Sequence, residues 1–516
     1  MKSLLFPLMT SLFLVFSCGG SVYIEDAEDS ENNNSTQDNI PILPSEDPEY
    51  DCEISIDCTS FVSTDYVGNG VQWDPYEIYA ISDSDWQKLY ARLDVMQPQF
   101  IRMMHNISGK SVHGILKKEE GLEHLMHLLD YCQSRNITVM FGDWGGSLVD
   151  PEAKTINEPL LRNSAEYLDF LINYKGYDCI KYYNLVNEPN GNWSQTNGDY
   201  WLWNKAVRFV WDEIKKMGLD AKVKMAAPDV AIWTPNETNW VKNTARDLSD
   251  ATGIYDIHTY PSKITVNSGE YTDIIKAYKD VVPTGAKIVM GEIGFKYIEA
   301  EDAPYQEENL RRAEALPHAS IEDSQMFVYD YMYGTDMADA LFQTINAGYS
   351  GCVAWMLDDA MHFKEPGKLK IWGFWNIFGD ERFGSEHEIV RPWFYAWSLL
   401  CRYLPQGSDF YTVDVSGLDG VKAIASVYNG KRTLALVNVS KEKRTVKITA
   451  DDFPVMENTW KYVYGEGLFT TSGDCNMNPA ATAFTFSPAA GEILEIAPES
   501  LILLTELAGF VRLQSV

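Results

Sequence analysis

Tyr182-Tyr183-Asn184-Leu185-Val186 is one of eight short, largely apolar runs that alternate with helical stretches along the chain. Such runs predict strands that are buried on both faces, as in a parallel sheet. The other seven runs are Gly70-Val71-Gln72-Trp73, Phe100-Ile101-Arg102-Met103-Met104, Thr138-Val139-Met140-Phe141, Val223-Lys224-Met225-Ala226-Ala227, Ile254-Tyr255-Asp256-Ile257, Lys287-Ile288-Val289-Met290 and Gly351-Cys352-Val353-Ala354-Trp355. Apolar residues between the runs recur at helical spacing, over 122–132, 203–216, 274–281 and 326–345.

Eight strand and helix units over roughly 330 residues fit a (β/α)8 barrel, the TIM-barrel fold, with insertions. A doubly wound open sheet is the alternative, but eight repeats without a glycine-rich phosphate turn favour a closed barrel. The segment Gly68-Asn69-Gly70 lacks the third glycine and the following helix of a dinucleotide-binding fingerprint. The predicted fold class is therefore α/β.

The pattern changes after a helix that is expected over residues 390–403. Val421 to Tyr428 reads as a strand, Asn429-Gly430 is a strong hairpin signal, and Thr433 to Val439 reads as the returning strand. Further strands are expected at 445–448, 460–464, 483–486 and 501–504. Short strands separated by turns predict a C-terminal antiparallel β-sandwich domain. Residues 52–66 are a candidate for one more strand of this sandwich.

The N-terminus has the pattern of an export signal. Residues 1–17 carry one charge, Lys2, and are otherwise mostly apolar, and the run is too short for a comfortable transmembrane span. It ends in Val15-Phe16-Ser17-Cys18, which resembles a bacterial lipobox. That resemblance implies a lipid-modified Cys18 at the mature N-terminus. The alternative is ordinary signal cleavage with an incidental Cys18.

An acidic segment follows the signal. Between Ser21 and Asp51 there are ten Asp or Glu residues and no Lys or Arg, so this segment is expected to be a flexible linker. The expected boundaries are 1–17 for the signal peptide, 18–51 for the linker, 52–405 for the barrel and 406–516 for the sandwich. A lipid anchor would place the protein in the bacterial cell envelope, at the outer membrane or cell surface. Its only expected membrane contact is through the lipid.

The composition narrows the choice of partner. The chain has 516 residues with 42 Lys and Arg against 74 Asp and Glu, a net charge of -32, which argues against a nucleic-acid partner. Its 15 Trp, 29 Tyr and 22 Phe largely serve a core, but flat aromatic faces also suit sugar rings. The cysteine spacing shows no zinc pattern, and no metal or other cofactor is expected. Cys52 and Cys58 are candidates for a disulfide in an exported protein, and a monomer is expected.

Two of the predicted strands end in glutamates. Asn187-Glu188-Pro189 ends the fourth strand, and Gly291-Glu292-Ile293-Gly294 ends the seventh. A barrel collects its chemistry at the C-terminal ends of its strands. Two carboxylates at one barrel mouth suit glycoside cleavage, in which one is the acid/base and the other the nucleophile. The alternative is that each glutamate is merely a solvated strand end.

With these residues in these places, residues 65–405 resemble the clan A glycoside hydrolases, which are retaining enzymes with a (β/α)8 barrel. In that clan an Asn-Glu pair ends the fourth strand and a second Glu ends the seventh. The resemblance implies that Glu188 is the acid/base, Glu292 the nucleophile and Asn187 a partner of the sugar 2-hydroxyl. A second copy, Asn157-Glu158-Pro159, follows no apolar strand and is interpreted as a loop or helix start.

Other strand ends agree with the resemblance. Arg102 matches the clan's arginine near the nucleophile, where a cation would lower the pKa of Glu292; a structural salt bridge is the other interpretation. His258 and Tyr260 follow the sixth strand, where the clan contacts the nucleophile and the substrate. The aromatic candidates for sugar platforms are Trp355, Trp144 and Trp193. His105, Asn106, Asp143 and Asp229 also fall at strand ends.

The expected function is that of a retaining glycosidase that cleaves β-glycosidic bonds in a poly- or oligosaccharide by double displacement. The pKa of Glu188 should then be raised and that of Glu292 lowered, with carboxyl groups about 5–5.5 Å apart. The alternative function is a non-catalytic carbohydrate-binding surface lipoprotein on a barrel scaffold. A serine or zinc hydrolase is disfavoured, because the motifs Gly-x-Ser-x-Gly and His-Glu-x-x-His are absent.

Overall fold

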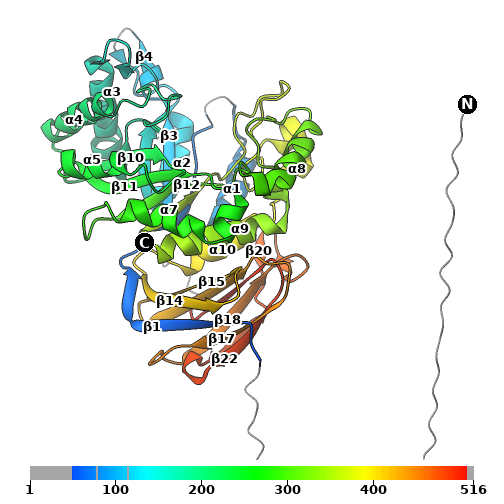
Figure 1. Cartoon of the computed structure of the whole chain (residues 1–516). Coiled ribbons are helices and arrows are strands. Elements are labelled where there is room, and N and C mark those ends of the chain that lie inside the picture. Colours follow the sequence, from blue (N-terminus) through cyan, green and yellow to red (C-terminus); the bar gives the residue numbers. More distant parts are fainter. Residues whose placement is uncertain (1–48, 77–78, 113–114, 508–516) are drawn as a thin grey trace, which may run out of the picture. The chain divides into compact units, whose positions relative to one another are not determined.

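The computed structural model of the protein describes residues 49–76, 79–112 and 115–507 (Figure 1). The expected signal peptide at 1–17, the expected lipidation site Cys18 and the linker as far as residue 48 lie outside the described residues. Among the helices of the described segments, none is long and apolar enough to cross a membrane.

Eight parallel strands close a barrel in chain order, as predicted, with the last strand paired to the first. Each of the eight apolar runs lies on or overlaps one of these strands. They are β2 (Gly68–Gln72), β3 (Phe100–His105), β6 (Thr138–Asp143), β9 (Ile180–Asn184), β10 (Lys224–Ala231), β11 (Thr252–Thr259), β12 (Ile288–Ile293) and β13 (Gly351–Ala354).

Helices fill the connections between the barrel strands. They are α1 (Asp83–Met96), α2 (Leu122–Ser134), α3 (Glu158–Asp169), α4 (Tyr200–Lys216), α5 (Asn239–Asp247), α6 (Lys263–Asn267), α7 (Glu270–Lys279), α8 (Ala303–Glu314), α9 (Tyr331–Asn346) and α10 (Trp393–Tyr403). Short 3-10 or π turns occur at Ser108–Lys110, Phe170–Tyr174, Ala300–Asp302, Met326–Tyr329, Gly379–Phe383, Ser385–Glu388 and Pro488–Ala490, and short strand pairs at Ser111–Val112 with Ile115–Leu116 and at Val149–Asp150 with Thr155–Ile156.

The sequence made a specific prediction about two of these helices, α3 and α9. Asn157 caps α3, where its side chain accepts a hydrogen bond from the backbone N–H of Leu160 at 3.4 Å, so the second Asn-Glu-Pro copy starts a helix. The helix expected over 326–345 is divided, because Asp330 is extended (φ -109°, ψ 145°) between the turn Met326–Tyr329 and α9.

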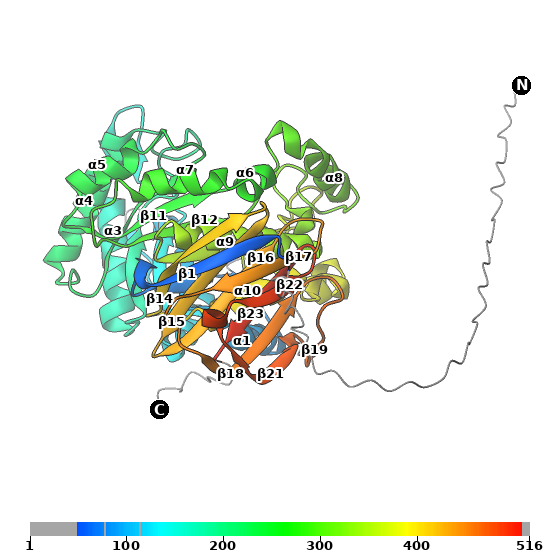
Figure 2. The same cartoon turned by 60° about the horizontal axis from the view of Figure 1, so that its bottom comes forward.

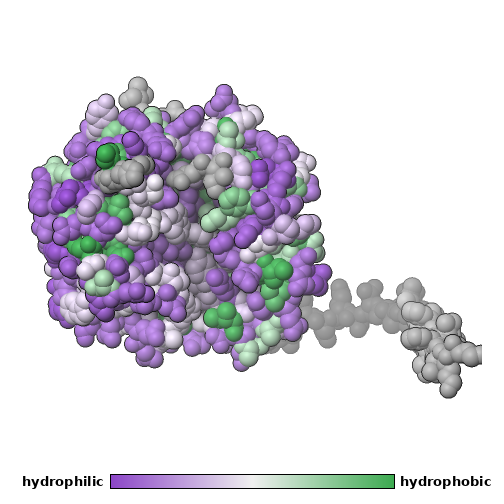
Figure 3. Space-filling view, turned by 90° about the horizontal axis from the view of Figure 1, so that it is seen from above, coloured by the Kyte–Doolittle hydropathy of each residue, from purple (hydrophilic) through white to green (hydrophobic). Residues whose placement is uncertain are grey.

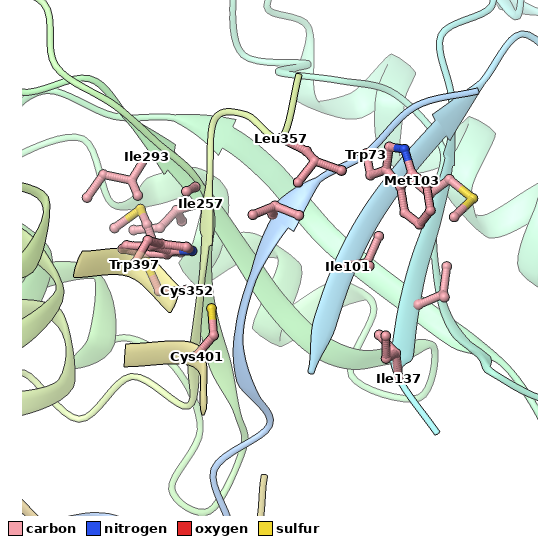
Figure 4. Close-up of a cluster of buried hydrophobic side chains, with 14 of the residues drawn as sticks. Trp73, Ile101, Met103, Ile137, Ile257, Ile293, Cys352, Leu357, Trp397 and Cys401 are labelled. Carbon is pink, nitrogen blue, oxygen red and sulfur yellow. The ribbon is translucent and has the colours of Figure 1, made fainter. Parts of the chain in front are cut away.

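The inside of the barrel changes from apolar to charged along its axis. Its apolar layer takes one side chain from each barrel strand or its edge: Val67, Phe100, Met140, Tyr182, Ala226, Ile254, Val289 and Val353. Alternate positions point inward along a strand, so the next inward residues include Arg102 and Asp256. Outward residues such as Ile101 and Met103 join a second cluster with Trp73, and Trp397 of α10 donates to the Gly70 carbonyl at 3.0 Å (Figure 4).

The C-terminal domain is a nine-stranded, mostly antiparallel sheet. Its strand order is β21 (Ala481–Phe486), β18 (Met456–Tyr464), β23 (Ser500–Thr505), β16 (Lys431–Asn438), β15 (Val421–Tyr428), β14 (Asp409–Gly417), β1 (Cys52–Ser63), β17 (Arg444–Thr449) and β22 (Glu492–Ile496). A short pair, β19 (Thr471–Ser472) with β20 (Asn476–Met477), stands apart from it. The Asn429-Gly430 hairpin is confirmed, because Tyr428 pairs with Lys431 and both turn residues have positive φ.

The N-terminal strand β1 belongs to this second domain. It pairs antiparallel with β14 and parallel with β17, which confirms the extra strand considered for residues 52–66. The boundary expected at residue 52 is therefore wrong for residues 52–63, which lie in the sheet and not in the barrel. A disulfide between Cys52 and Cys58 is also absent: both are free thiols. Six residues along one strand separate them by about 20 Å, whereas bridged Cα atoms lie within about 7 Å.

The two domains share a core. Along β16, Leu434 and Leu436 enter the core of the sheet domain, whereas Ala435 and Val437 join the large core that includes α9 and α10. Figure 2 looks onto the sheet with these helices behind it. Hydrogen bonds cross the contact, from Tyr464 Oη to the Tyr331 carbonyl at 2.8 Å and from Asn346 Nδ2 to the Ala423 carbonyl at 3.0 Å. The C-terminal sheet thus packs against α9 and α10, the helices before and after the eighth barrel strand.

Candidate active site

Buried charged side chains gather at the C-terminal ends of the barrel strands. They are Arg102 on β3, Asp229 on β10, Asp256 and His258 on β11, and Glu292 on β12. The face of the molecule seen from above is hollowed at its centre (Figure 3). Burying this many charges is costly unless they pair with one another, which makes the cluster a functional candidate.

Glu292 is held through both of its oxygens. Arg102 Nη1 donates to Oε1 at 2.5 Å, and the Tyr260 hydroxyl donates to Oε2 at 2.7 Å. Two donors on opposite oxygens fix the plane of the carboxylate and favour its ionised form. Burial nevertheless raises the pKa of Glu292 above its ordinary value, although the charges of His258 and Arg102 act against it.

Glu188 lies in the loop after β9 and has a backbone in the left-handed region, with φ 46°. Trp193 Nε1 donates to its Oε2 at 2.9 Å, and His258 Nδ1 lies 3.3 Å from its Oε1. One oxygen of Glu188 and one of Glu292 lie within 4.8 Å of each other. Left-handed backbone at a non-glycine residue is strained and tends to occur at functional sites.

The pKa order of the two glutamates is the reverse of the expected one. Burial would raise the pKa of Glu188, but the hydrogen bond and charge of His258 outweigh burial and lower it. Both ring nitrogens of His258 face carboxylate oxygens, Nδ1 toward Glu188 and Nε2 toward Asp229 at 3.0 Å. A neutral ring has only one N–H, so this position favours the imidazolium. Burial opposes that charge, but Asp229 and Glu292 prevail and raise the pKa of His258 well above its ordinary value.

Arg102 and Asp229 connect the two glutamates. Arg102 Nη2 donates to Asn187 Oδ1 at 2.7 Å and lies 3.1 Å from Asp229 Oδ2. Because Arg102 Nη1 also donates to Glu292, the arginine contacts the motifs of both glutamates. The backbone N–H of Glu188 donates to the Asp229 carbonyl at 3.0 Å. Asp229 itself has φ 62°. Burial would raise its pKa, but the charges of Arg102 and His258 keep it below the usual range.

The predicted aromatic residues lie at the same mouth. Trp144 and Trp355 form an edge-to-face pair with ring centroids 6.4 Å apart, and the guanidinium of Arg102 lies 6.0 Å from the Trp144 ring. Trp193 is 58% exposed and reaches Glu188 through its ring N–H. The structure therefore brings together every residue that the sequence singled out for catalysis or substrate binding.

A carboxylate that the sequence did not single out lies beside Trp144. Asp74 accepts hydrogen bonds from Trp144 Nε1 at 2.9 Å, the Met104 N–H at 2.8 Å and Gln72 Nε2 at 2.6 Å. Burial raises its pKa to about 6. It faces a cavity of about 200 Å³ whose other lining residues include Tyr76, Tyr79, Trp144, Asp358 and Phe378. Its position directly after the first apolar run was the one available signal.

The other strand-end residues have local structural contacts. Asp143 Oδ1 accepts from the backbone N–H groups of Ile107 and Gly145 at 3.0 and 2.6 Å, and His105 stacks on Tyr167. Asn106 accepts from the Gly109 N–H at 2.9 Å and lines the cavity beside Asp74. Asp229 contacts Arg102 and His258, which lie beside the two glutamates.

The side chains in the described residues that could ligate a metal ion already contact one another. Glu188, His258 and Glu292 place one such atom each within 4.8 Å, as do Asp229, Asp256 and His258. The imidazolium of His258 offers no lone pair to a metal, and Arg102 occupies the neighbouring positions on Glu292 and Asp229. This set of donors fits a proton-transfer network better than a metal centre.

Solved structures share this architecture. A glycoside hydrolase family 30 subfamily 8 xylanase from Clostridium acetobutylicum matches with a TM-score of 0.58 and 12% identity, over 88% of this chain and 99% of that chain. A family 51 α-L-arabinofuranosidase from Bifidobacterium longum matches with a TM-score of 0.62 and 12% identity, over 89% of this chain and 99% of that chain. A family 39 β-xylosidase from Caulobacter crescentus matches with a TM-score of 0.53 and 12% identity, over 88% and 99%.

These matches establish the fold of the chain. No protein-family model and no curated protein sequence matches it significantly. The coverage necessarily includes both domains, so the predicted combination of a (β/α)8 barrel with a C-terminal β domain is confirmed as the fold of these clan A glycoside hydrolases.

Proposed function

We propose that the protein is a retaining glycoside hydrolase that cleaves β-glycosidic bonds in a poly- or oligosaccharide. The observation that carries this proposal is the approach of Glu188 and Glu292 to within 4.8 Å between oxygens at one barrel mouth. Retaining enzymes hold their carboxyl groups about 5–5.5 Å apart, whereas inverting enzymes leave about 6.5–9.5 Å for a water molecule. The spacing therefore favours double displacement.

The chemistry then has two steps. In the first, a Glu292 oxygen attacks the anomeric carbon, the glycosidic C–O bond breaks, and Glu188 gives its proton to the leaving oxygen. This step leaves a glycosyl ester on Glu292. In the second, Glu188 takes a proton from a water molecule whose oxygen attacks the same carbon, and the ester bond breaks. Arg102 and Tyr260 hold the Glu292 carboxylate in place for both steps.

The proton for the first step is stored in the Glu188 and His258 pair. With His258 protonated and Glu188 ionised, the pair carries one proton that can move from Nδ1 to Oε1 across 3.3 Å. This arrangement accounts for a catalytic acid whose pKa is lowered in the unliganded cleft. The state that donates to the leaving oxygen is neutral His258 beside protonated Glu188.

The pH profile tests this proton store. Activity is present while His258 holds the proton and falls as pH rises through its pKa, which lies well above its ordinary value. In His258→Gln, the alkaline limb of kcat/KM should follow Glu188 instead and move to lower pH by about one unit or more. His258→Asn should behave alike, with folding of both variants checked by circular dichroism. An alkaline limb at the wild-type pH in both variants would contradict the sharing of one proton between Glu188 and His258.

The substrate class is tested by a hydrolysis screen. The solved structures of this fold include enzymes named xylanase, β-xylosidase and α-L-arabinofuranosidase. We expect sugar release from at least one of xylan, mixed-linkage β-glucan and the aryl β-xylosides and β-glucosides, with no release by Glu292→Ala. Binding of these sugars without release by the wild type would instead favour the non-catalytic carbohydrate-binding protein.

We also propose that the chain is exported and lipid-anchored through Cys18 in the bacterial cell envelope. The support is the sequence Val15-Phe16-Ser17-Cys18 followed by the acidic segment. Mass spectrometry of the N-terminal peptide tests it. A diacylglyceryl group on Cys18 is the expected result, and an unmodified thiol or an uncleaved signal would contradict it.

A further inference from the structure

A second pair of exposed indole rings lies beside Glu188. Trp193 and Trp233 are 58% and 43% exposed, and their ring centroids lie 6.0 Å apart with an interplanar angle of 85°. Trp193 donates its ring N–H to Glu188 Oε2 at 2.9 Å, so the pair is fixed to the acid/base glutamate. Two large apolar rings left this exposed at a barrel mouth offer a surface for another ring.

The loops that carry the two rings are tied together. Trp193 follows β9 and Trp233 follows β10. The amide of Asn190 spans the two loops, donating to the Ala231 carbonyl at 2.7 Å and accepting from the Ala231 N–H at 3.1 Å. The Trp193 ring lies over Gly191, where a Cβ would come within 2.2 Å of the ring. The pair is therefore held by specific contacts, as a binding surface requires.

The ring pair and the Asp74 cavity lie in opposite sectors of the barrel mouth. In the closed strand order, β13 and β2 are each four strands away from β9 and β10 respectively. The cavity takes its lining from the ends of β13, β2, β3 and β6, including Asp74, Trp144 and Met356. Successive contacts lead from Trp193 through Glu188, Glu292 and Arg102 to Trp144, which lines the cavity.

The position of the catalytic acid indicates which part of the substrate lies in which sector of the barrel mouth. The glutamate that protonates the leaving oxygen must stand next to the group that departs with that oxygen. Glu188 has that role in the proposed mechanism, and Trp193 is bonded to it. The sugar that is transferred to Glu292 therefore extends toward the Asp74 cavity, and the leaving group extends toward the ring pair.

We propose that Trp193 and Trp233 form a platform for a leaving-group sugar, with Trp233 as a specificity-determining residue. The ligand is a neutral pyranose ring whose apolar C–H face stacks on an indole. The substrate is thus an oligo- or polysaccharide with a sugar on both sides of the cleaved bond. This inference rests on the proposed function.

The test compares two kinds of donor, glycosyl fluorides and tetrasaccharides, whose leaving groups differ in whether they can reach the platform. β-D-xylosyl fluoride and β-D-glucosyl fluoride lose a single atom that cannot reach the platform, whereas xylotetraose and cellotetraose lose sugars that stack on it. Trp233→Ala should lower kcat/KM for the tetrasaccharide by about tenfold or more, and leave fluoride release within about twofold of the wild type. Trp233→Phe, which keeps an aromatic face, should recover most of the loss. The matched control is Trp201→Ala, because Trp201 is 65% exposed on α4 and has no part in the site.

Each outcome decides the proposal. An unchanged rate on the tetrasaccharides, or an equal loss on fluorides and tetrasaccharides, would overturn it. A wild type that cleaves neither the fluorides, the tetrasaccharides nor any substrate of the screen would contradict the proposed function instead. The platform is then tested separately by quenching of tryptophan fluorescence with xylotetraose and cellotetraose. Quenching that Trp233→Ala loses and Trp201→Ala keeps supports the platform, and its absence in the wild type overturns it.

Discussion

Glu292→Ala is expected to lower kcat by about four to six orders of magnitude, the loss that follows removal of a nucleophile from other enzymes. Arg102 and Tyr260 both contact this carboxylate, at 2.5 and 2.7 Å. Without it, no glycosyl ester forms and the first step stops. The rate is measured on the best substrate of the screen, with thermal unfolding to show that the variant is folded.

Added azide gives a second test of Glu292 as the nucleophile. In Glu292→Ala the small anion can occupy the vacated space and attack a glycosyl fluoride from that side, which gives a glycosyl azide of inverted configuration. The matched control is Glu158→Ala. Glu158 belongs to the second Asn-Glu-Pro copy, but it is exposed at the start of α3, so its loss should leave the rate unchanged. Near wild-type turnover by Glu292→Ala would contradict its assignment as nucleophile.

Glu188→Ala is expected to lower kcat/KM for sugar leaving groups by about two to four orders of magnitude, the usual contribution of general acid catalysis. Cleavage of a glycosyl fluoride should suffer less in its first step, because fluoride departs without a proton. The second step then lacks its base, and added azide should restore turnover. The product in this variant should be a glycosyl azide of retained configuration.

The two azide products together assign the roles. Inverted azide from Glu188→Ala and retained azide from Glu292→Ala would mean that the roles are exchanged. That exchange is a real alternative, because the pKa of Glu292 is raised and that of Glu188 is lowered in the unliganded cleft. The geometry favours the assignment made here: the permanently charged Arg102 contacts Glu292, and the ring pair of Trp193 and Trp233 stands beside Glu188.

The barrel could be predicted from the sequence because its strands are buried on both faces. Runs such as Phe100 to Met104 stand out from the amphipathic helices between them, and counting them places Glu188 after the fourth strand and Glu292 at the end of the seventh. Parallel strands end at one mouth, so the meeting of the two glutamates followed from their order. The same counting, together with the resemblance to clan A, placed Arg102, His258 and Tyr260 near them.

Features that depend on long-range packing were not visible in the sequence. Residues 52–66 could be considered as an extra strand, but no local pattern predicts that β1 pairs with β14, about 350 residues away. β14 and β22 are largely half-buried or exposed and carry little apolar signal. Trp233 becomes notable only beside Trp193, forty residues earlier.

The sequence also did not predict that the pKa of Glu188 is lowered and that of Glu292 raised. His258 lies 70 residues from Glu188, and the contact that lowers the pKa of the glutamate requires the closed barrel. The sequence predicted which charged groups meet, but not whether Glu188 or Glu292 would lie closer to the imidazolium of His258. The proton store follows from that contact.

The central claim is that Glu188 and Glu292 act by double displacement, and the configuration of the first product tests it most directly. Proton NMR of a fresh reaction on a β-linked substrate from the screen resolves the two anomeric forms before they interconvert. A β-anomer formed first, with the α-anomer appearing only by mutarotation, is the predicted result. An α-anomer formed first would show direct displacement by water and would contradict the account.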